Sequence, residues 1–142
     1  MLDKKIIEFI SEHHVLTLAV SNNNIPYCAN CFYVFDENNN KLIFTSDKST
    51  RHILDTENNN VVAGSIVLET KKVGKIQGIQ FNGFLEEIEG NYYKEANKLY
   101  LKHYPYAILK KTSLWSVDIK YIKMTDNRLG FGKKLIWGEE II

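Results

Sequence analysis

The feature that most constrains the fold of this chain is the alternation of short apolar runs with turn-forming asparagines. The triplet NNN occurs three times, at residues 22–24, 38–40 and 58–60, and each copy separates apolar stretches. Asparagine tolerates left-handed backbone and closes turns with its side chain, so we interpret the triplets as loops. Strands are expected at Val15–Val20, within Ile25–Phe35 and at Lys41–Ser46. Because the loops between them are short, antiparallel pairing is predicted.

Four further strands are predicted from dense β-branched residues or alternating polarity, at Val61–Glu69, Val73–Glu89, Leu114–Met124 and Asn127–Trp137. The second of these contains Gly74, Gly78 and Gly83, which predicts a bent or bulged strand or the close approach of a ligand. Three helices are expected: one capped by Asp3, one over residues 47–57, and one over residues 92–103 that Pro105 ends.

About seven strands and three helices without regular βαβ alternation favour connected antiparallel strands that close on themselves. We therefore predict a mainly β fold, a small β-barrel with peripheral helices. The length of 142 residues indicates a single domain over residues 1–142, and a hydrophobic content of 44% is enough for a substantial core.

Composition excludes several classes of protein. The net charge of +1 gives no indication of a nucleic-acid partner. No run of eighteen apolar residues is present, so a membrane span is not predicted and no membrane partner is expected. The opening residues, MLDKKIIEFISEHH, contain acids and no long apolar region, so they do not resemble a signal peptide, and a cytoplasmic location is expected.

The stretch FTSDKSTRH, residues 44–52, concentrates hydroxyl groups and cations where a strand ends. Its hydroxyl donors are Thr45, Ser46, Ser49 and Thr50, and its cations are Lys48 and Arg51. If a helix begins near Asp47, its free backbone N–H groups point the same way, and the combination predicts a phosphate site. The alternative is an ordinary helix cap followed by a solvated face.

The C-x-x-C motif at Cys28 and Cys31 lies in an apolar, aromatic run with the composition of a strand. Residues three apart in a strand face opposite ways about 10 Å apart, whereas a disulfide needs Cα atoms within roughly 7 Å. Zinc would need two more ligands, and the four histidines show no paired ligand spacing. We interpret the pair as two reduced thiols, and no metal site is predicted.

Two further segments carry polar groups suited to a ligand. In QGIQFNG, residues 77–83, alternation places Gln77 on one face of the strand and Gln80 on the other, so only one of them can face a given site. In residues 120–137 the cations Lys120, Lys123, Arg128, Lys133 and Lys134 stand against a single acid, Asp126. Either segment suits an anionic or planar ligand, and either is equally explained as a solvated strand face. GFGKK, residues 130–134, fails as a phosphate loop at both ends.

The order of these pieces resembles the pyridoxamine-phosphate-oxidase-like split-barrel family, which binds FMN at a dimer interface. The motifs CANCFYVFD, KSTRH, IQGIQFNG and TDNRLGFGKKLIW together look like a small bacterial branch, the YhbP-like group. The resemblance runs from Ile6 to about Trp137. It implies a homodimeric split β-barrel of the FMN-binding type.

Matching residues by motif, the resemblance implies that the strand-end residues Phe44, Thr45 and Ser46 lie along the flavin. Thr50 and Arg51 stand where the family has an Arg–Lys pair that grips the FMN phosphate, and Lys48 is a candidate to compensate for the missing cation. The ring would be lined by the strand residues Asn30, Cys31 and Phe32. Gln77 is matched to the flavin-facing Gln of the family, with Gln80 as its rival. The C-terminal strand of the partner subunit would supply Asn127, Arg128 and Lys133.

The chain departs from the oxidase where RLGFGKK replaces an Arg-containing motif that holds pyridoxal phosphate, so a vitamin B6 oxidase is not expected. The resemblance implies an FMN-dependent oxidoreductase and does not identify its substrate. No Ser–His–Asp set or paired-carboxylate motif is present, and no catalytic residue is named. Two alternatives stay open: a split barrel that holds haem or a deazaflavin, and a ligand-free dimer that acts as a binding or scaffold module.

Overall fold

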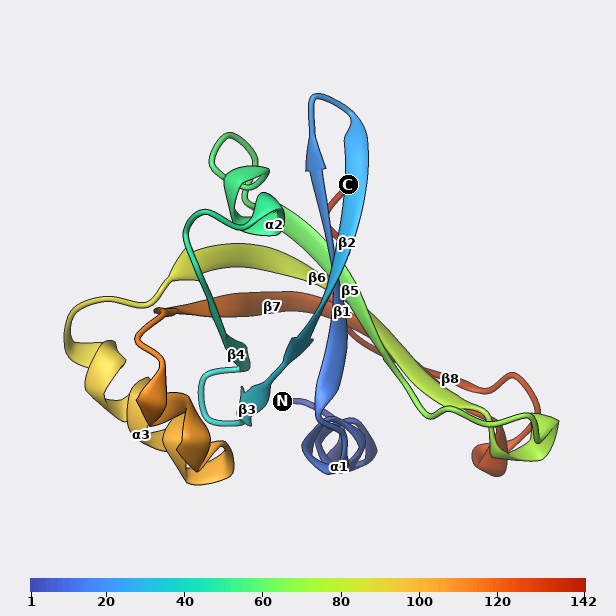
Figure 1. Ribbon diagram of the computed structural model, residues 1–142. Helices are drawn as coiled ribbons and strands as arrows, with labels where there is room; N and C mark the ends of the chain where they lie inside the picture. The colour runs from blue at the N-terminus through green and yellow to red at the C-terminus, as the bar shows by residue number, and fades with distance from the viewer.

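The computed structural model describes all 142 residues as one antiparallel sheet that coils into a half-barrel, with helices at its ends (Figure 1). Neighbouring strands follow the order β2-β1-β5-β6-β7-β4-β3, and β8 pairs with β7. The strands are β1 Val15–Asn22, β2 Ile25–Phe32, β3 Val34–Asp36, β4 Lys41–Ser46, β5 Val61–Val67, β6 Gln77–Glu87, β7 Ser113–Asp126 and β8 Lys134–Gly138. The predicted mainly β architecture with antiparallel pairing is confirmed.

Three α-helices and three short 3-10 turns complete the chain. They are α1 Lys4–Glu12, α2 Arg51–Leu54, α3 Asn91–His103, η1 Val73–Lys75, η2 Pro105–Leu109 and η3 Asn127–Leu129. None of the helices combines the length and the apolar character that crossing a membrane requires.

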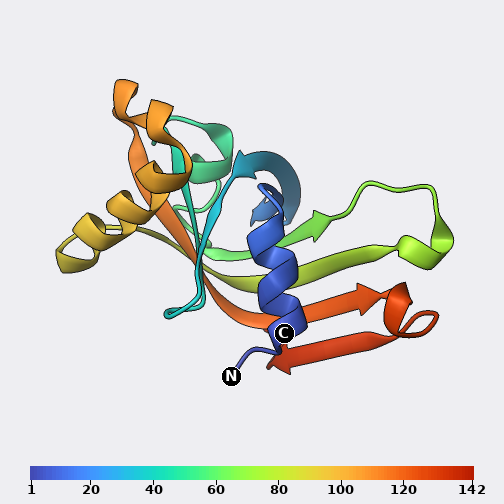
Figure 2. The same ribbon diagram turned by 90° about the horizontal axis from the view of Figure 1, so that it is seen from below.

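The main core lies on the inner face of the coiled sheet, where α1 covers it (Figure 2). In β1 the alternation is plain: Leu16 and Leu18 are buried inside, while Thr17 between them faces outward. The helix α1 begins where expected, because the Asp3 side chain accepts a hydrogen bond of 2.8 Å from the backbone N–H of Lys5. Alternation therefore divides the sheet into an apolar inner face and an outer face.

A second, smaller core forms where α3 packs against β3 and β4. Tyr100 of α3 and Tyr104, which follows the last residue of α3, pack with Val34 and Ile43. The residues next to Val34 and Ile43 in the chain point to the other side of the sheet, into the main core. The Tyr104 hydroxyl donates to the Tyr33 carbonyl oxygen at 2.6 Å. The last turn of α3 is thereby fixed beside the end of β4.

The long strands β6 and β7 bend because their register shifts between Asn82 and Gly83. A Cβ atom at Gly83 would overlap the carbonyl oxygen of Asp118 on β7, so only glycine allows this approach. The predicted bulge is therefore confirmed at Gly83, whereas Gly74 lies in η1 outside the strand.

Several boundaries differ from the sequence-based expectation, and three of the differences have a clear structural reason. The helix expected over residues 47–57 is only the four-residue α2, because residues 47–50 form a turn in which the Thr50 N–H donates to the Asp47 carbonyl oxygen. The run Ile25–Phe35 splits into β2 and β3 at Tyr33, whose N–H donates to the His14 carbonyl oxygen, so there are eight strands instead of seven. The last strand begins at Lys134, after a turn in which Gly130 and Gly132 have positive φ.

Candidate functional site

A cavity of about 360 Å³ opens where β4 ends beside α3 and η2. It gathers four of the residues predicted to bind a cofactor: Phe32, Thr45, Ser46 and Thr50. The opposite wall comes from later in the chain and consists of aromatic rings, a hydroxyl and a cation: Tyr100, Tyr106, Thr112 and Lys110. Two of the three predicted strand-end residues, Thr45 and Ser46, therefore share a concave surface with Phe32 and Thr50.

A second cavity, of about 410 Å³, continues from the first along α3. The two share Thr45, Tyr100 and Lys110 in their walls, and the second adds Tyr93 and Lys111. Volumes of this size are typical of small-molecule sites. Their shared walls make one elongated depression with aromatic sides and lysines at its edge.

Hydrogen bonds hold the hydroxyl groups of the site in place. Trp115 Nε1 on β7 donates to the Ser46 carbonyl oxygen at 3.0 Å. The Ser46 hydroxyl lies 2.6 Å from His52 Nε2, and the Thr50 hydroxyl donates to the Asp47 carbonyl oxygen at 2.8 Å. Burial holds the pKa of His52 below its ordinary 6.5, which favours the neutral imidazole.

Arg51 and Lys48, the cations predicted to bind the phosphate, contact other side chains of their own chain. The Arg51 guanidinium lies over the Tyr27 ring, 4.1 Å from its centroid, with Nε 3.5 Å from the Asp55 carboxylate. Lys48 pairs with Glu87 at 3.4 Å. Neither residue lines the cavity, because α2 starts at Arg51 and turns that side chain toward β2.

Lys110 is the cation that lines the cavity at the end of β4. It lines both cavities and its ammonium lies 3.8 Å from the Asp47 carboxylate. The pair is exposed, so an anion can compete with Asp47 for Lys110 at little cost.

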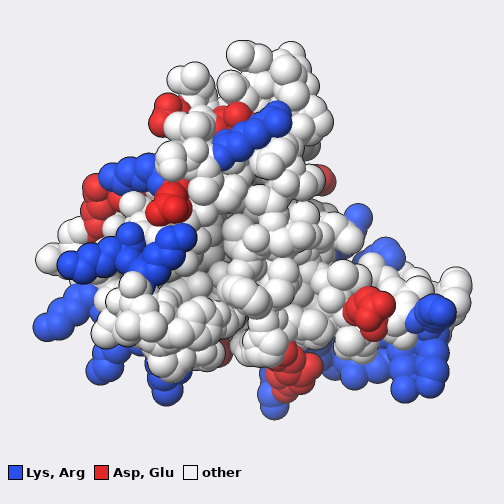
Figure 3. Space-filling view, viewed as in Figure 1, with Lys and Arg blue, Asp and Glu red and all other residues white.

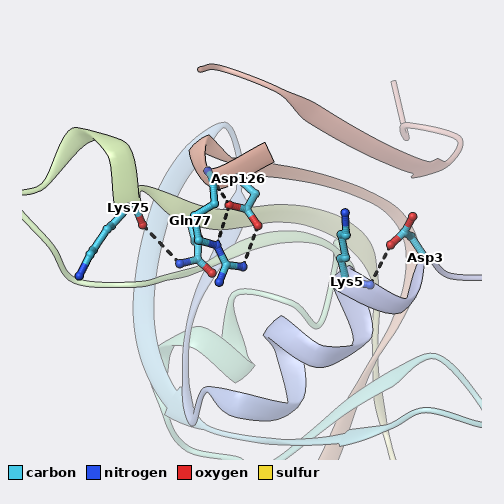
Figure 4. Close-up of polar contacts among 6 residues, drawn as sticks. Asp3, Lys5, Lys75, Gln77 and Asp126 are labelled. Atoms are coloured by element: carbon cyan, nitrogen blue, oxygen red, sulfur yellow. Dashed lines mark hydrogen bonds and ion pairs between the residues drawn. The ribbon is translucent and has the colours of Figure 1, made fainter. Parts of the chain in front are cut away.

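Three other predicted residues point to the inner face of the sheet instead of the cavity. Phe44 is fully buried in the main core, and Cys31 is buried there too, which raises the pKa of its thiol to about 11. Gln77 is also buried; its amide donates to the Lys75 carbonyl oxygen and lies beside Asp126 (Figure 4). The side chains of these three residues are therefore not available to a ligand in this cavity.

The outer face of the sheet holds Asn30 and Gln80. Asn30 Oδ1 accepts from the Thr17 hydroxyl at 2.9 Å, and Gln80 lies in register with Ser65 on β5. Gln80 lines a shallow depression of about 460 Å³ with Cys28. The register is thus settled: Gln80 faces outward and Gln77 inward. Cys28 is exposed and Cys31 is buried, and both thiols are free. No group of three or more His, Cys, Asp or Glu side chains lies close enough together to hold a metal ion.

The predicted C-terminal residues lie on the hairpin of β7 and β8, at the opposite end of the molecule from the cavity (Figure 1). The Asn127 amide is used within the hairpin: it donates to the Val73 carbonyl oxygen at 2.8 Å and accepts from the Gly132 N–H at 3.0 Å. Arg128 makes two hydrogen bonds to the Asp126 carboxylate and holds the pKa of Asp126 below its ordinary value. Lys133 is exposed. Within one chain these residues do not reach the cavity.

Sequence reasoning missed the contribution of α3 and η2 to the site. Tyr100 of α3 is buried, and its burial raises the pKa of its hydroxyl. Its hydroxyl nevertheless lies 3.5 Å from the Thr45 hydroxyl at the cavity wall. The sequence does show an aromatic residue, a cation and a hydroxyl directly before β7, at Tyr106, Lys110 and Thr112. No local pattern, however, indicates that this segment lies beside β4.

The coiled antiparallel half-barrel has the fold of the split β-barrel class. The structure is similar to a haem-binding protein from Mycobacterium smegmatis, with a TM-score of 0.78, 14% identity, and coverage of 97% of this chain and 59% of that one. It is also similar to an FAD-binding protein from Mesorhizobium loti, with a TM-score of 0.71, 12% identity, and coverage of 87% and 94%. HutZ, the haem storage protein of Vibrio cholerae, matches with a TM-score of 0.68, 16% identity, and coverage of 84% and 90%.

Within this class the chain belongs to the UPF0306 family. It is 39% identical over 132 residues to a UPF0306 protein of Photorhabdus laumondii, covering 93% of this chain and 92% of that protein. A UPF0306 protein of Pasteurella multocida is 33% identical over 136 residues, covering 96% and 91%. No family model matches the chain.

Proposed function

We propose that this protein binds FMN in the cavity at the end of β4 and acts as a flavin-dependent oxidoreductase. The observation that carries the proposal is the convergence of hydroxyl donors, aromatic rings and a lysine in one concave site. Four of those residues, Phe32, Thr45, Ser46 and Thr50, were expected there from the sequence. Bound flavin would supply hydride or electron transfer, and the chain would supply binding and orientation.

The residues present fit such a cofactor. Phe32, Tyr100 and Tyr106 offer apolar and aromatic surface for a flat ring. Ser46 and Thr50 offer hydroxyl groups, and Lys110 offers a cation for an anionic tail. In this proposal Lys110, and not Arg51, binds the phosphate of FMN.

The composition of the cavity walls favours a flavin over haem. Haem iron in proteins is held by His, Cys, Met or Tyr. No His, Cys or Met lines either cavity, and the only side chains of these types are tyrosines. Burial raises the pKa of Tyr100, which disfavours the tyrosinate that an iron ligand would need.

We also propose that the protein is a homodimer. The outer face of the sheet exposes large apolar side chains that a second copy would cover: Val15, Phe32, Val67 and Ile136. The partner subunit is proposed to add groups from its C-terminal hairpin to the site. Of Asn127, Arg128 and Lys133, the lysine is the one whose side chain makes no hydrogen bond or ion pair within its own chain.

A titration of the purified, ligand-stripped protein with FMN, riboflavin and haemin, followed by absorbance and flavin fluorescence, tests the proposal. Saturable binding of FMN, tighter than that of riboflavin, supports a cavity that recognises the phosphate. Saturable binding of haemin alone would replace the flavin assignment, and binding of none of the three would favour a ligand-free scaffold dimer. Light scattering on the same sample reports the dimer separately from the cofactor.

A further inference from the structure

The second cavity of the candidate site, of about 410 Å³, is a groove between α3 and the segment that leads from η2 into β7. Tyr93, Asn97 and Leu101 line it at intervals of four residues, which places them on one face of α3. The buried residues Tyr100 and Leu114 line it as well. The groove therefore offers aromatic and apolar surface to a small molecule.

Polar groups of the groove are free to bind a ligand. No side-chain hydrogen bond of α3 involves the Asn97 amide or the Tyr93 hydroxyl. Lys111 lines this groove and not the cavity at the end of β4. It forms no ion pair, whereas Lys110 is paired with Asp47. Lys111 is thus a cation available to a ligand of the groove.

The charges around the groove favour an anion. No aspartate or glutamate lines it, whereas Lys110 and Lys111 both do. Residues 91–112, from the start of α3 to the end of this segment, hold five lysines and one glutamate. Lys and Arg side chains accordingly crowd this end of the molecule, at the left of Figure 3. A positive potential of this kind raises the local concentration of an anionic ligand.

We propose that the groove binds the substrate of the flavin, and that this substrate is a small organic carboxylate with an apolar body. Its role as a substrate rests on the proposed function, in which FMN fills the neighbouring cavity and its phosphate binds Lys110. Lys111 then remains for the second ligand. One lysine matches the single charge of a carboxylate at pH 7 better than the higher charge of a phosphomonoester. Lys111 is therefore the specificity-determining residue.

A second copy of the chain is a less suitable occupant of the groove. The C-terminal hairpin that it would bring to the neighbouring cavity carries three cations and one carboxylate in residues 126–134. Those cations would repel Lys110 and Lys111, and an anion bound between them would relieve the repulsion. The proposed dimer is therefore compatible with a carboxylate in the groove.

Titration of the isotope-labelled, FMN-free protein with cinnamate and with its neutral analogue cinnamamide, followed by backbone amide shifts, tests the proposal. Cinnamate is expected to give saturable shifts at Asn97 and Lys111 and to bind several-fold more tightly than cinnamamide. Lys111→Gln is expected to weaken cinnamate binding about three- to fivefold, as for an exposed ion pair. It should change the binding of cinnamamide and of FMN by less than about twofold, equivalent to roughly 0.4 kcal/mol.

The matched control is Lys102→Gln, which makes the same charge change on an exposed residue of α3 outside the groove and is expected to leave cinnamate binding unchanged. An equal loss in this control would overturn the proposal, because net charge alone would then act. Cinnamamide or phenyl phosphate bound at least as tightly as cinnamate would overturn it too, as would displacement of cinnamate by FMN.

A parallel titration with FMN separates this inference from the proposed function. Saturable FMN binding without cinnamate shifts in the groove would overturn the carboxylate site and leave the proposed function standing. Cinnamate binding in the groove without any FMN binding would support the carboxylate site and overturn its role as a substrate site.

Discussion

Replacing Lys110 by alanine distinguishes the proposed FMN site at the end of β4 from a phosphate site centred on Arg51. Lys110 is the cation that lines both cavities, whereas Arg51 lies over Tyr27 beside Asp55. The Lys110→Ala variant is expected to weaken FMN binding and Arg51→Ala to leave it almost unchanged. A phosphate grip centred on Arg51 predicts the opposite ranking.

The magnitude follows from the contacts of Lys110. A hydrogen bond to a charged group contributes about 1.5–3 kcal/mol. The Lys110 side chain is 77% exposed and shares its charge with Asp47, so solvent screening and the competing pair reduce this value. We expect a loss of about 1–2 kcal/mol, which is a rise of about 5- to 30-fold in Kd.

Fluorescence titration with FMN, repeated with riboflavin, measures the effect. Because riboflavin lacks the phosphate, Lys110→Ala should change its affinity by less than about twofold, equivalent to roughly 0.4 kcal/mol. The FMN penalty should also shrink as salt is raised. An unchanged FMN affinity in Lys110→Ala, together with a large loss in Arg51→Ala, would refute the placement of the phosphate.

Three other predictions concern the scaffold. Gly83→Ala should lower the free energy of unfolding by about 1–3 kcal/mol in urea, since its Cβ would overlap backbone on β7, whereas Gly74→Ala, with open space around it, should be close to neutral. Burial holds the pKa of His52 in the folded chain below 6.5, so as the pH falls His52 is protonated in the unfolded chain before it is protonated in the folded chain. The free energy of unfolding should therefore decrease as the pH drops below 6.5. His52→Gln should reduce this pH dependence, measured by denaturation curves at several pH values. Cys28 should react rapidly with a thiol reagent and Cys31 slowly, because Cys31 is buried with its pKa raised to about 11, and replacing both by serine should leave FMN binding intact.

Local patterns predicted most of the sheet correctly, because the alternation of apolar and polar residues within a strand indicates which of its faces is buried. The alternation in β1 and the run Lys41–Ser46 gave boundaries that the structure reproduces or extends by a few residues. The split at Tyr33 was beyond such reasoning, since it depends on a hydrogen bond from Tyr33 to the distant His14.

The site was predicted only in part, for a physical reason. Hydroxyls at a strand end are visible locally, which is how Thr45, Ser46 and Thr50 were found. The direction of a long side chain is decided by its tertiary partners, and Arg51 turned to Tyr27 and Asp55. The register of a strand also decides which face each side chain occupies. Gln77 and Gln80 are three positions apart in β6 and therefore lie on opposite faces, so Gln77 is buried and Gln80 is exposed.

Mapping the FMN contact by backbone amide chemical shifts tests the central claim most directly. Titration of the isotope-labelled protein should shift the amides of Thr45, Ser46, Thr50, Tyr106 and Lys110, and the shifts should saturate with one FMN per chain. Saturable shifts confined to the outer face around Thr17, Ser65 and Gln80, or no shifts at the end of β4, would contradict the account.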